Sequence, residues 1–184
     1  MKTSRKRKVI KIPINTIESK LPYVIKKNCC SVGVDTASRT GLCIARTTKT
    51  DISLDYSFLD MQSKNKYHKY NTLINHINNY LKNEKVDILV IEETFFGMNA
   101  NVFQFLSRIG GMVYTVAHLL NIKEKVFITA TQSRKALQLP CNKKKDVVHE
   151  AFHVLIPEVK ITDIDIIDAV ILALNGLILP QSLV

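Results

Sequence analysis

Four acidic side chains stand where carboxylates could act together on a metal ion. Asp35 closes a short apolar run, CCSVGVDT, and Glu92 directly follows the apolar run ILVI. Asp165 and Asp168 begin an apolar segment, and their spacing of three puts both on one face of a helix. A carboxylate at the end of a buried strand costs free energy unless it is solvated, paired or bound to a cation.

Four carboxylates in one place would need positive charge, and hard divalent cations supply it. Mg²⁺ prefers oxygen ligands and keeps positions for water and substrate phosphates. Two such ions about 4 Å apart can activate a water and stabilise the leaving 3′ oxygen of a phosphodiester. The acids therefore suggest metal-dependent phosphodiester chemistry if they converge, which spacing alone does not establish.

Each acid also has a purely structural interpretation, and the sequence leaves these interpretations open. Thr162 or Asp163 could cap the last helix, whose first acids would then favour the helix dipole. Asp35 could form a local turn with the hydroxyl groups that follow it. Glu92 and Glu93 could be a solvated strand end.

The hydrophobic pattern predicts the elements that must position these acids. Short apolar, β-branched stretches predict five strands, at residues 29–36, 41–47, 52–59, 86–91 and 126–129. Helical spacing predicts helices over residues 67–81, 101–120, 131–137, 145–155 and 163–179. Three antiparallel strands followed by alternating helices and strands predict an α/β fold, a mixed sheet with helices on both faces.

The 184 residues carry a net charge of +10, most of it in the first 28 residues. That stretch holds nine basic residues and one acid, Glu18, for a net charge of +8, whereas residues 29–184 carry +2. Pro13 and Pro22 discourage long regular structure there. We expect residues 1–28 to form a mobile or loosely docked basic arm, for nucleic-acid binding or only for solubility. Residues 29–184 should form one domain.

Composition excludes several classes of protein. Hydrophobic residues make up 46% of the chain, so collagen and wholesale disorder are excluded, and no apolar run reaches the ~20 residues of a membrane span. The four cysteines lack zinc-site spacing and suggest free thiols, and His149 and His153 lack nearby partner ligands. We expect the cytoplasm of a bacterial or phage-infected cell, with an organelle as the alternative, because the first 17 residues are basic and acid-poor.

Three motifs, in order, resemble those of RuvC-type Holliday junction resolvases. VGVDTASRTGLCIA is similar to their first strand and its Ser-Arg turn, and VDILVIEETFFGMNAN to their second motif. DIDIIDAVILAL resembles the Asp-x-x-Asp-Ala start of their final helix. The likeness runs from about residue 29 to residue 174. It departs from the family at Thr36 and Ala37, where the family usually has Pro-Gly, and the basic arm lies upstream of the family's usual start.

The resemblance implies an RNase H-like fold with a mixed five-stranded sheet of order 3-2-1-4-5. That order places the first and fourth strands side by side under the last helix. It would gather the catalytic, metal-binding carboxylates Asp35, Glu92, Asp165 and Asp168. Side-chain alternation supports Glu92 over Glu93, because Glu92 shares a face of its strand with Val90.

The resemblance also implies a basic half of the site. Lys145 matches a catalytic lysine near the scissile phosphate, where a cation stabilises developing charge. Phe95 matches an aromatic residue that can stack on bases at the junction centre, although ordinary packing stays open for Phe95 and Phe96. The other residues at DNA-binding positions, for which a plain solvated surface is the alternative, are Ser38, Arg39, Arg134, Lys135, Lys143 and Lys144.

The function implied is a homodimeric, metal-dependent endonuclease that resolves four-way (Holliday) DNA junctions in recombination and repair. Two Mg²⁺ ions per site, with Mn²⁺ as a substitute, would support water attack that leaves a 5′ phosphate and a 3′ hydroxyl. The helix over residues 101–120, with Gly110 and Gly111, is the candidate dimer surface. The alternatives are an RNase H-like nuclease acting on RNA–DNA hybrid or ribosomal RNA precursor, and a non-catalytic junction-binding protein.

Overall fold

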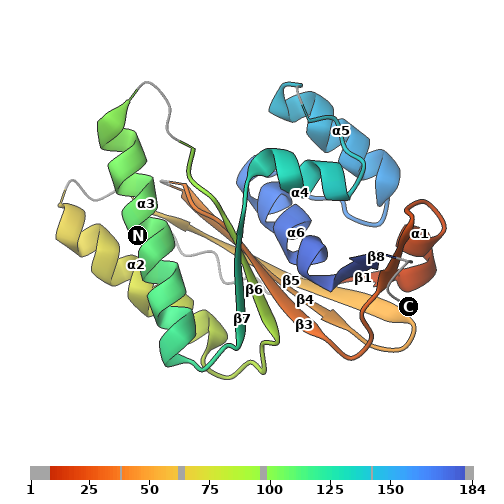
Figure 1. The fold of residues 1–184 in the computed structure, drawn as a ribbon, viewed down its shortest axis with the longest axis horizontal. Helices are drawn as coiled ribbons and strands as arrows, with labels where there is room; N and C mark the ends of the chain where they lie inside the picture. The colour runs from red at the N-terminus through yellow and green to blue at the C-terminus, as the bar shows by residue number, and fades with distance from the viewer. Residues whose placement is uncertain (1–8, 38, 62–64, 96–98, 142, 181–184) are drawn as a thin grey trace.

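A mixed sheet between two layers of helices forms the centre of the protein (Figure 1). The computed structural model describes residues 9–37, 39–61, 65–95, 99–141 and 143–180. The strands of the main sheet lie in the order β1-β5-β4-β3-β6-β7. Their bounds are β1 Ile10–Pro13, β3 Cys30–Asp35, β4 Arg39–Thr47, β5 Asp51–Asp60, β6 Ile88–Glu92 and β7 Glu124–Ile128. A second, two-stranded sheet pairs β2 (Tyr23–Ile25) with β8 (Ile178–Pro180).

Helices cover both faces of the main sheet, as the sequence predicts. Helices α2 and α3 pack on one face, and α6 packs on the other with α1, α4 and α5 around it (Figure 1). Their bounds are α1 Ile14–Glu18, α2 Lys66–Leu81, α3 Ala100–Leu119, α4 Ala130–Ala136, α5 Lys145–Leu155 and α6 Ile164–Leu177. Within the described residues, each predicted helix is present, with ends shifted by at most two residues.

The predicted order of the five strands is confirmed, and the sheet gains one strand. Strand β3 pairs antiparallel with β4 and parallel with β6, and β6 pairs parallel with β7. The five predicted strands therefore run β5-β4-β3-β6-β7, which is the order 3-2-1-4-5. The additional strand, β1, pairs antiparallel with the start of β5 and extends that edge.

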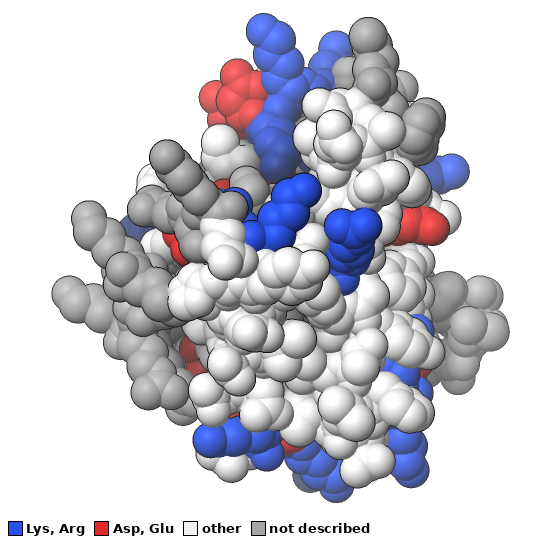
Figure 2. Space-filling model, turned by 90° about the vertical axis from the view of Figure 1, so that its left-hand side faces the viewer, with Lys and Arg blue, Asp and Glu red and all other residues white. Residues whose placement is uncertain are grey.

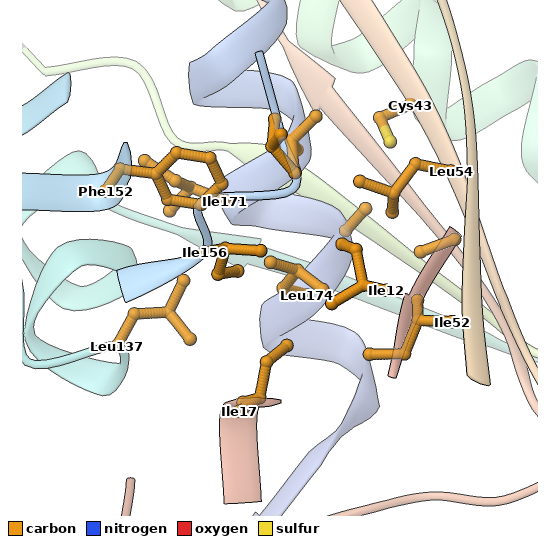
Figure 3. Close-up of a cluster of buried hydrophobic side chains, with 14 of the residues drawn as sticks. Ile12, Ile17, Cys43, Ile52, Leu54, Leu137, Phe152, Ile156, Ile171 and Leu174 are labelled. Carbon is orange, nitrogen blue, oxygen red and sulfur yellow. The ribbon is translucent and has the colours of Figure 1, made fainter. Parts of the chain in front are cut away.

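Residues 10–25, which the sequence analysis places in a loosely docked arm, are built into the fold. Besides β1, they supply α1 and β2, and five of their apolar side chains are buried: Ile12, Ile14, Ile17, Leu21 and Ile25. These side chains join one core cluster with Leu137, which directly follows α4, and with residues of α5 and α6 (Figure 3). Lys11 and Lys20, together with Pro13 and Pro22, obscure this apolar pattern in the sequence. Residues 1–8 lie outside the described part of the chain.

Helix α6 lies unusually close to the central strands because two glycines face it. A Cβ atom at Gly33 in β3 would lie 2.9 Å from the Cβ of Leu172 and would overlap the backbone of Ala169 and Ala173. A Cβ atom at Gly41 in β4 would overlap the carbonyl oxygen of Asp165. Backbone therefore packs against backbone here, which fixes the height of α6 above the sheet.

Replacing Gly33 by Ala should destabilise the protein by about 1–3 kcal/mol or more, because an added methyl group forces a packed helix to move. Urea denaturation measures the change in the free energy of unfolding. Gly111 in α3 is the matched control, since a Cβ there meets no atom within 4 Å. Gly111→Ala should be neutral or stabilising by up to about 1 kcal/mol. Equal stability of the Gly33→Ala variant and the unchanged protein would refute the backbone contact.

Candidate active site

The ends of two neighbouring strands bring Asp35 and Glu92 together. Strands β3 and β6 are parallel and in register, with Val34 opposite Ile91, so the residues that follow lie at the same edge of the sheet. Asp35 is only 4% exposed. The two carboxyl groups lie within hydrogen-bonding reach of each other.

Burial and like charge set the protonation of this pair. Burial, and then the charge of Glu92, raise the pKa of Asp35 well above its ordinary value. Burial also raises the pKa of Glu92, although the hydrogen bond with Asp35 partly offsets it. Among the described residues, the Oδ2 atom of Asp35 is buried without a hydrogen-bond partner. The charge of Lys145 offsets the raised pKa values of the pair only in part.

Asp168, on α6, faces this pair and is held by basic side chains. It is 6% exposed, and its Oδ2 accepts a hydrogen bond of 2.7 Å from Nζ of Lys145 at the start of α5. Its Oδ1 lies 3.5 Å from Nε2 of His149 and 4.0 Å from Nη2 of Arg134. Burial would raise the pKa of Asp168, but His149 and Lys145 outweigh it and hold that pKa below its ordinary value.

Lys145 interacts electrostatically with Asp168, Asp35 and Glu92. Burial opposes its charge, but the hydrogen bond to Asp168 and the charges of Asp35 and Glu92 prevail and raise the pKa of Lys145. The ammonium group is therefore firmly charged. Its side chain is half exposed, so it faces both the acids and the surface.

Asp165 points to a different partner, although its spacing from Asp168 predicts a shared face. Its Oδ2 accepts a hydrogen bond of 2.8 Å from Nη1 of Arg39. The same guanidinium group binds both oxygens of Asp163, which caps α6 by accepting from the backbone N–H of Ile166. The sequence analysis predicts that Arg39 contacts DNA, whereas in the structure its guanidinium group pairs with Asp163 and Asp165 at the start of α6.

The other predicted site residues differ in their exposure. An open cleft of about 510 Å³ adjoins Glu92 and is lined by Glu93, Phe95, Leu106 and residues at the start of α4. Phe95 is 85% exposed. Lys135, Lys143 and Lys144 are exposed, whereas Arg134 is largely covered. Ser38 and Phe96 lie outside the described residues.

His149 is the residue that the sequence analysis leaves out of the site. It is 7% exposed and lies beside Asp168, whereas Nδ1 of His153 is 2.7 Å from the carbonyl oxygen of Val159. The spacing of four between Lys145 and His149 was the available signal, since it puts both on one face of α5.

The donor set fits hard divalent cations. Asp35, Glu92 and Asp168 supply carboxylate oxygens, which Mg²⁺ prefers, and the unpartnered Oδ2 of Asp35 is a buried acceptor of the right kind. Within the described part of the chain, no three acidic, histidine or cysteine side chains are already gathered as ligands of one ion. The present partners of Asp168 and Asp165 are instead the cations Lys145 and Arg39.

A mixed sheet of this order, with acids at the ends of β3 and β6 and at the start of α6, defines a nuclease of the RNase H-like class. The sequence model of the family described as crossover junction endodeoxyribonuclease RuvC matches residues 31–175. The chain therefore belongs to the RuvC family, whose members are metal-dependent nucleases.

Solved structures of resolvases share this fold. Thermus thermophilus RuvC in complex with a Holliday junction substrate has a TM-score of 0.67 and 14% identity, covering 79% of this chain and 91% of that one. Another T. thermophilus RuvC structure has a TM-score of 0.66 and 14% identity, covering 83% and 99%. The yeast mitochondrial Holliday junction resolvase Ydc2 has a TM-score of 0.57 and 10% identity, covering 86% and 80%.

A search of curated protein sequences gave no match. In the described ranges we find no helix with the length and apolar character of a membrane span.

Replacing Asp35 by Asn should stabilise the metal-free protein at neutral pH. The raised pKa means that the folded state binds a proton more tightly than the unfolded chain. Stability is unaffected below the unfolded pKa of about 3.9. As the pH rises above that value, the free energy of unfolding falls by up to about 1.4 kcal/mol per pH unit until the pH exceeds the pKa of Asp35 in the folded protein. Asn carries no such penalty.

Urea denaturation in EDTA from pH 4 to pH 8 measures this effect. The stability gain of Asp35→Asn should be largest at pH 8 and shrink toward pH 4. Asp51→Asn, which changes an acid at the start of β5, is the matched control. A gain that is independent of pH, or a loss at neutral pH, would contradict the raised pKa of Asp35.

Proposed function

We propose that this chain resolves four-way DNA junctions as a magnesium-dependent endonuclease. The observation that supports this most is the convergence of Asp35, Glu92 and Asp168 opposite Lys145 in a member of the RuvC family. The T. thermophilus relative solved with a Holliday junction supports branched DNA as the substrate. Cleavage would leave products with a 5′ phosphate and a 3′ hydroxyl.

Asp35, Glu92 and Asp168 would hold the ions, joined by Asp165 when it is free of Arg39. When bound, two Mg²⁺ ions, or Mn²⁺ in their place, supply activation of the attacking water and charge neutralisation at the leaving oxygen. Lys145 donates to the scissile phosphate, because its ammonium group is charged and reaches the surface. His149 and Arg134 keep Asp168 ionised and oriented.

Exposed side chains around the cleft are suited to the DNA. The ring of Phe95 projects beside the cleft and can stack on unpaired bases at the junction centre. Lys135, Lys143 and Lys144 are free to bind phosphates of the arms. Residues 1–8 carry further basic residues for this purpose.

Cleavage of defined substrates tests this function. The purified protein should cut a synthetic four-way junction with Mg²⁺, and should cut neither a matched duplex nor any substrate in EDTA. Asp35→Asn should abolish cutting and spare junction binding, because it removes a metal ligand and keeps the shape of the side chain. Asp51→Asn should cut normally. Preference for an RNA–DNA hybrid would exclude this function, and retained cutting by Asp35→Asn would remove Asp35 from the site.

We also propose that the protein is a homodimer, so that two sites cut opposing strands symmetrically. Figure 2 looks onto the side of α2 and α3 and shows a broad area free of Lys, Arg, Asp and Glu. On α3 the exposed residues include Gly111, Thr115 and Tyr114, which is 40% exposed. Gly110 instead faces inward, because a Cβ atom added there would lie 3.4 Å from the ring of Phe127. Of the two glycines, Gly111 therefore belongs to this surface.

Replacing Gly111 by Arg should dissociate the dimer, because a long charged side chain would enter a surface where helices approach closely. Light scattering after size-exclusion chromatography measures the mass in solution. Gly111→Ala, which adds a single methyl group, should weaken the dimer far less. A monomer that still makes paired cuts in one junction would rule out the dimer.

A further inference from the structure

Arg39, at the start of β4, is locked in place by four contacts. Its Nη1 donates to Oδ1 of Asp163 at 2.6 Å and to Oδ2 of Asp165 at 2.8 Å, and its Nη2 donates to Oδ2 of Asp163. Its guanidinium carbon lies 4.0 Å from the centre of the Phe58 ring. The hydrogen bond with Asp163 outweighs burial and raises the pKa of Arg39, so the group stays charged.

Asp163 is the stronger of the two acidic partners. It binds the guanidinium group through both oxygens, and this paired geometry is the most favourable that arginine forms with a carboxylate. It also caps α6, which ties Arg39 to the start of the helix. Asp165 makes a single hydrogen bond with the same group. Asp163 therefore anchors Arg39 next to Asp165.

We propose that Arg39, anchored by Asp163, is a positioning residue that holds Asp165 out of the metal site until DNA arrives. This inference rests on the proposed function, in which Asp165 is a metal ligand. Asp168, Lys145 and Glu92 supply the charges that act on Asp35, whereas Asp165 is engaged by Arg39. Three of the five N–H donors of Arg39 serve the two acids, and its side chain is 31% exposed.

A DNA phosphate can reach the guanidinium group from the exposed side. Phosphate and Asp165 then compete for the same donors, whereas Asp163 keeps its two bonds. Release of Asp165 by the phosphate would complete the ligand set only on substrate. This couples metal loading to DNA binding, and the coupling is reciprocal, since DNA and metal each favour the state that the other binds.

Two substitutions separate this arrangement from simple electrostatics. Asp163→Asn keeps a good helix cap and removes the anchor, so Arg39 retains only a partly exposed single pair with Asp165, which is weak. Electrostatics alone predicts weaker cation binding, because an acid is lost, whereas our proposal predicts stronger binding. Arg39→Lys keeps the charge but loses the forked geometry, so electrostatics alone predicts no change and our proposal predicts stronger binding.

Mn²⁺ titration of the full, DNA-free protein, followed by electron paramagnetic resonance, measures this difference. Asp163→Asn and Arg39→Lys should each bind Mn²⁺ about threefold more tightly or better, with Asp51→Asn unchanged. Urea denaturation checks that the variants are folded. Unchanged or weaker binding by folded variants overturns the positioning role while leaving the proposed function in place. Failure of every form to bind Mn²⁺ overturns both.

Discussion

The close contact between α6 and the two central strands determines the geometry of the site. Gly33 and Gly41 let the backbone of the helix rest directly on β3 and β4. Because α6 is almost entirely buried, it can neither rise nor slide without opening the core. Asp168 therefore keeps a fixed position opposite the strand ends that carry Asp35 and Glu92. The fold thus brings like charges together through packing forces that are unrelated to charge.

The protein compensates for this crowding in three different ways. Burial raises the pKa of both Asp35 and Glu92, which favours uptake of a proton by the pair. Asp168 stays ionised because Lys145, His149 and Arg134 surround it. Asp165 is neutralised by Arg39 outside this group. A divalent ion at Asp35 and Glu92 would relieve an electrostatic cost that Lys145 offsets only in part.

The sequence predicts the parts of this arrangement that depend on local pattern. Strand ends, helix starts and the four acids follow from alternation, helical spacing and motif order, and resemblance supplies the strand order. The pairing of Arg39 with Asp165 does not follow, because it joins residues 126 positions apart and depends on the rotamers of both. The docking of residues 10–25 does not follow from local pattern either, because their isoleucines are buried against the distant helices α5 and α6.

Helices α5 and α6 both contribute side chains to the site, and different parts of the chain hold them in place. The acids of α6 depend on the central sheet, whereas Lys145 and His149 come from α5, whose far end is held by the N-terminal residues. Nζ of Lys20 donates to the carbonyl oxygens of Val154 and Leu155, at 3.1 and 2.7 Å, where α5 ends. Such a cation satisfies the free carbonyl groups of the last turn and its negative dipole end.

Further contacts make the same attachment. Oγ1 of Thr16 donates to Glu158 at 3.0 Å, just after α5, and Ile17 packs in one cluster with Phe152 and Ile156 (Figure 3). These N-terminal residues precede the stretch that the family model matches, residues 31–175. The segment outside the matched stretch therefore supports the helix that carries Lys145, and the two halves of the site rest on different parts of the chain.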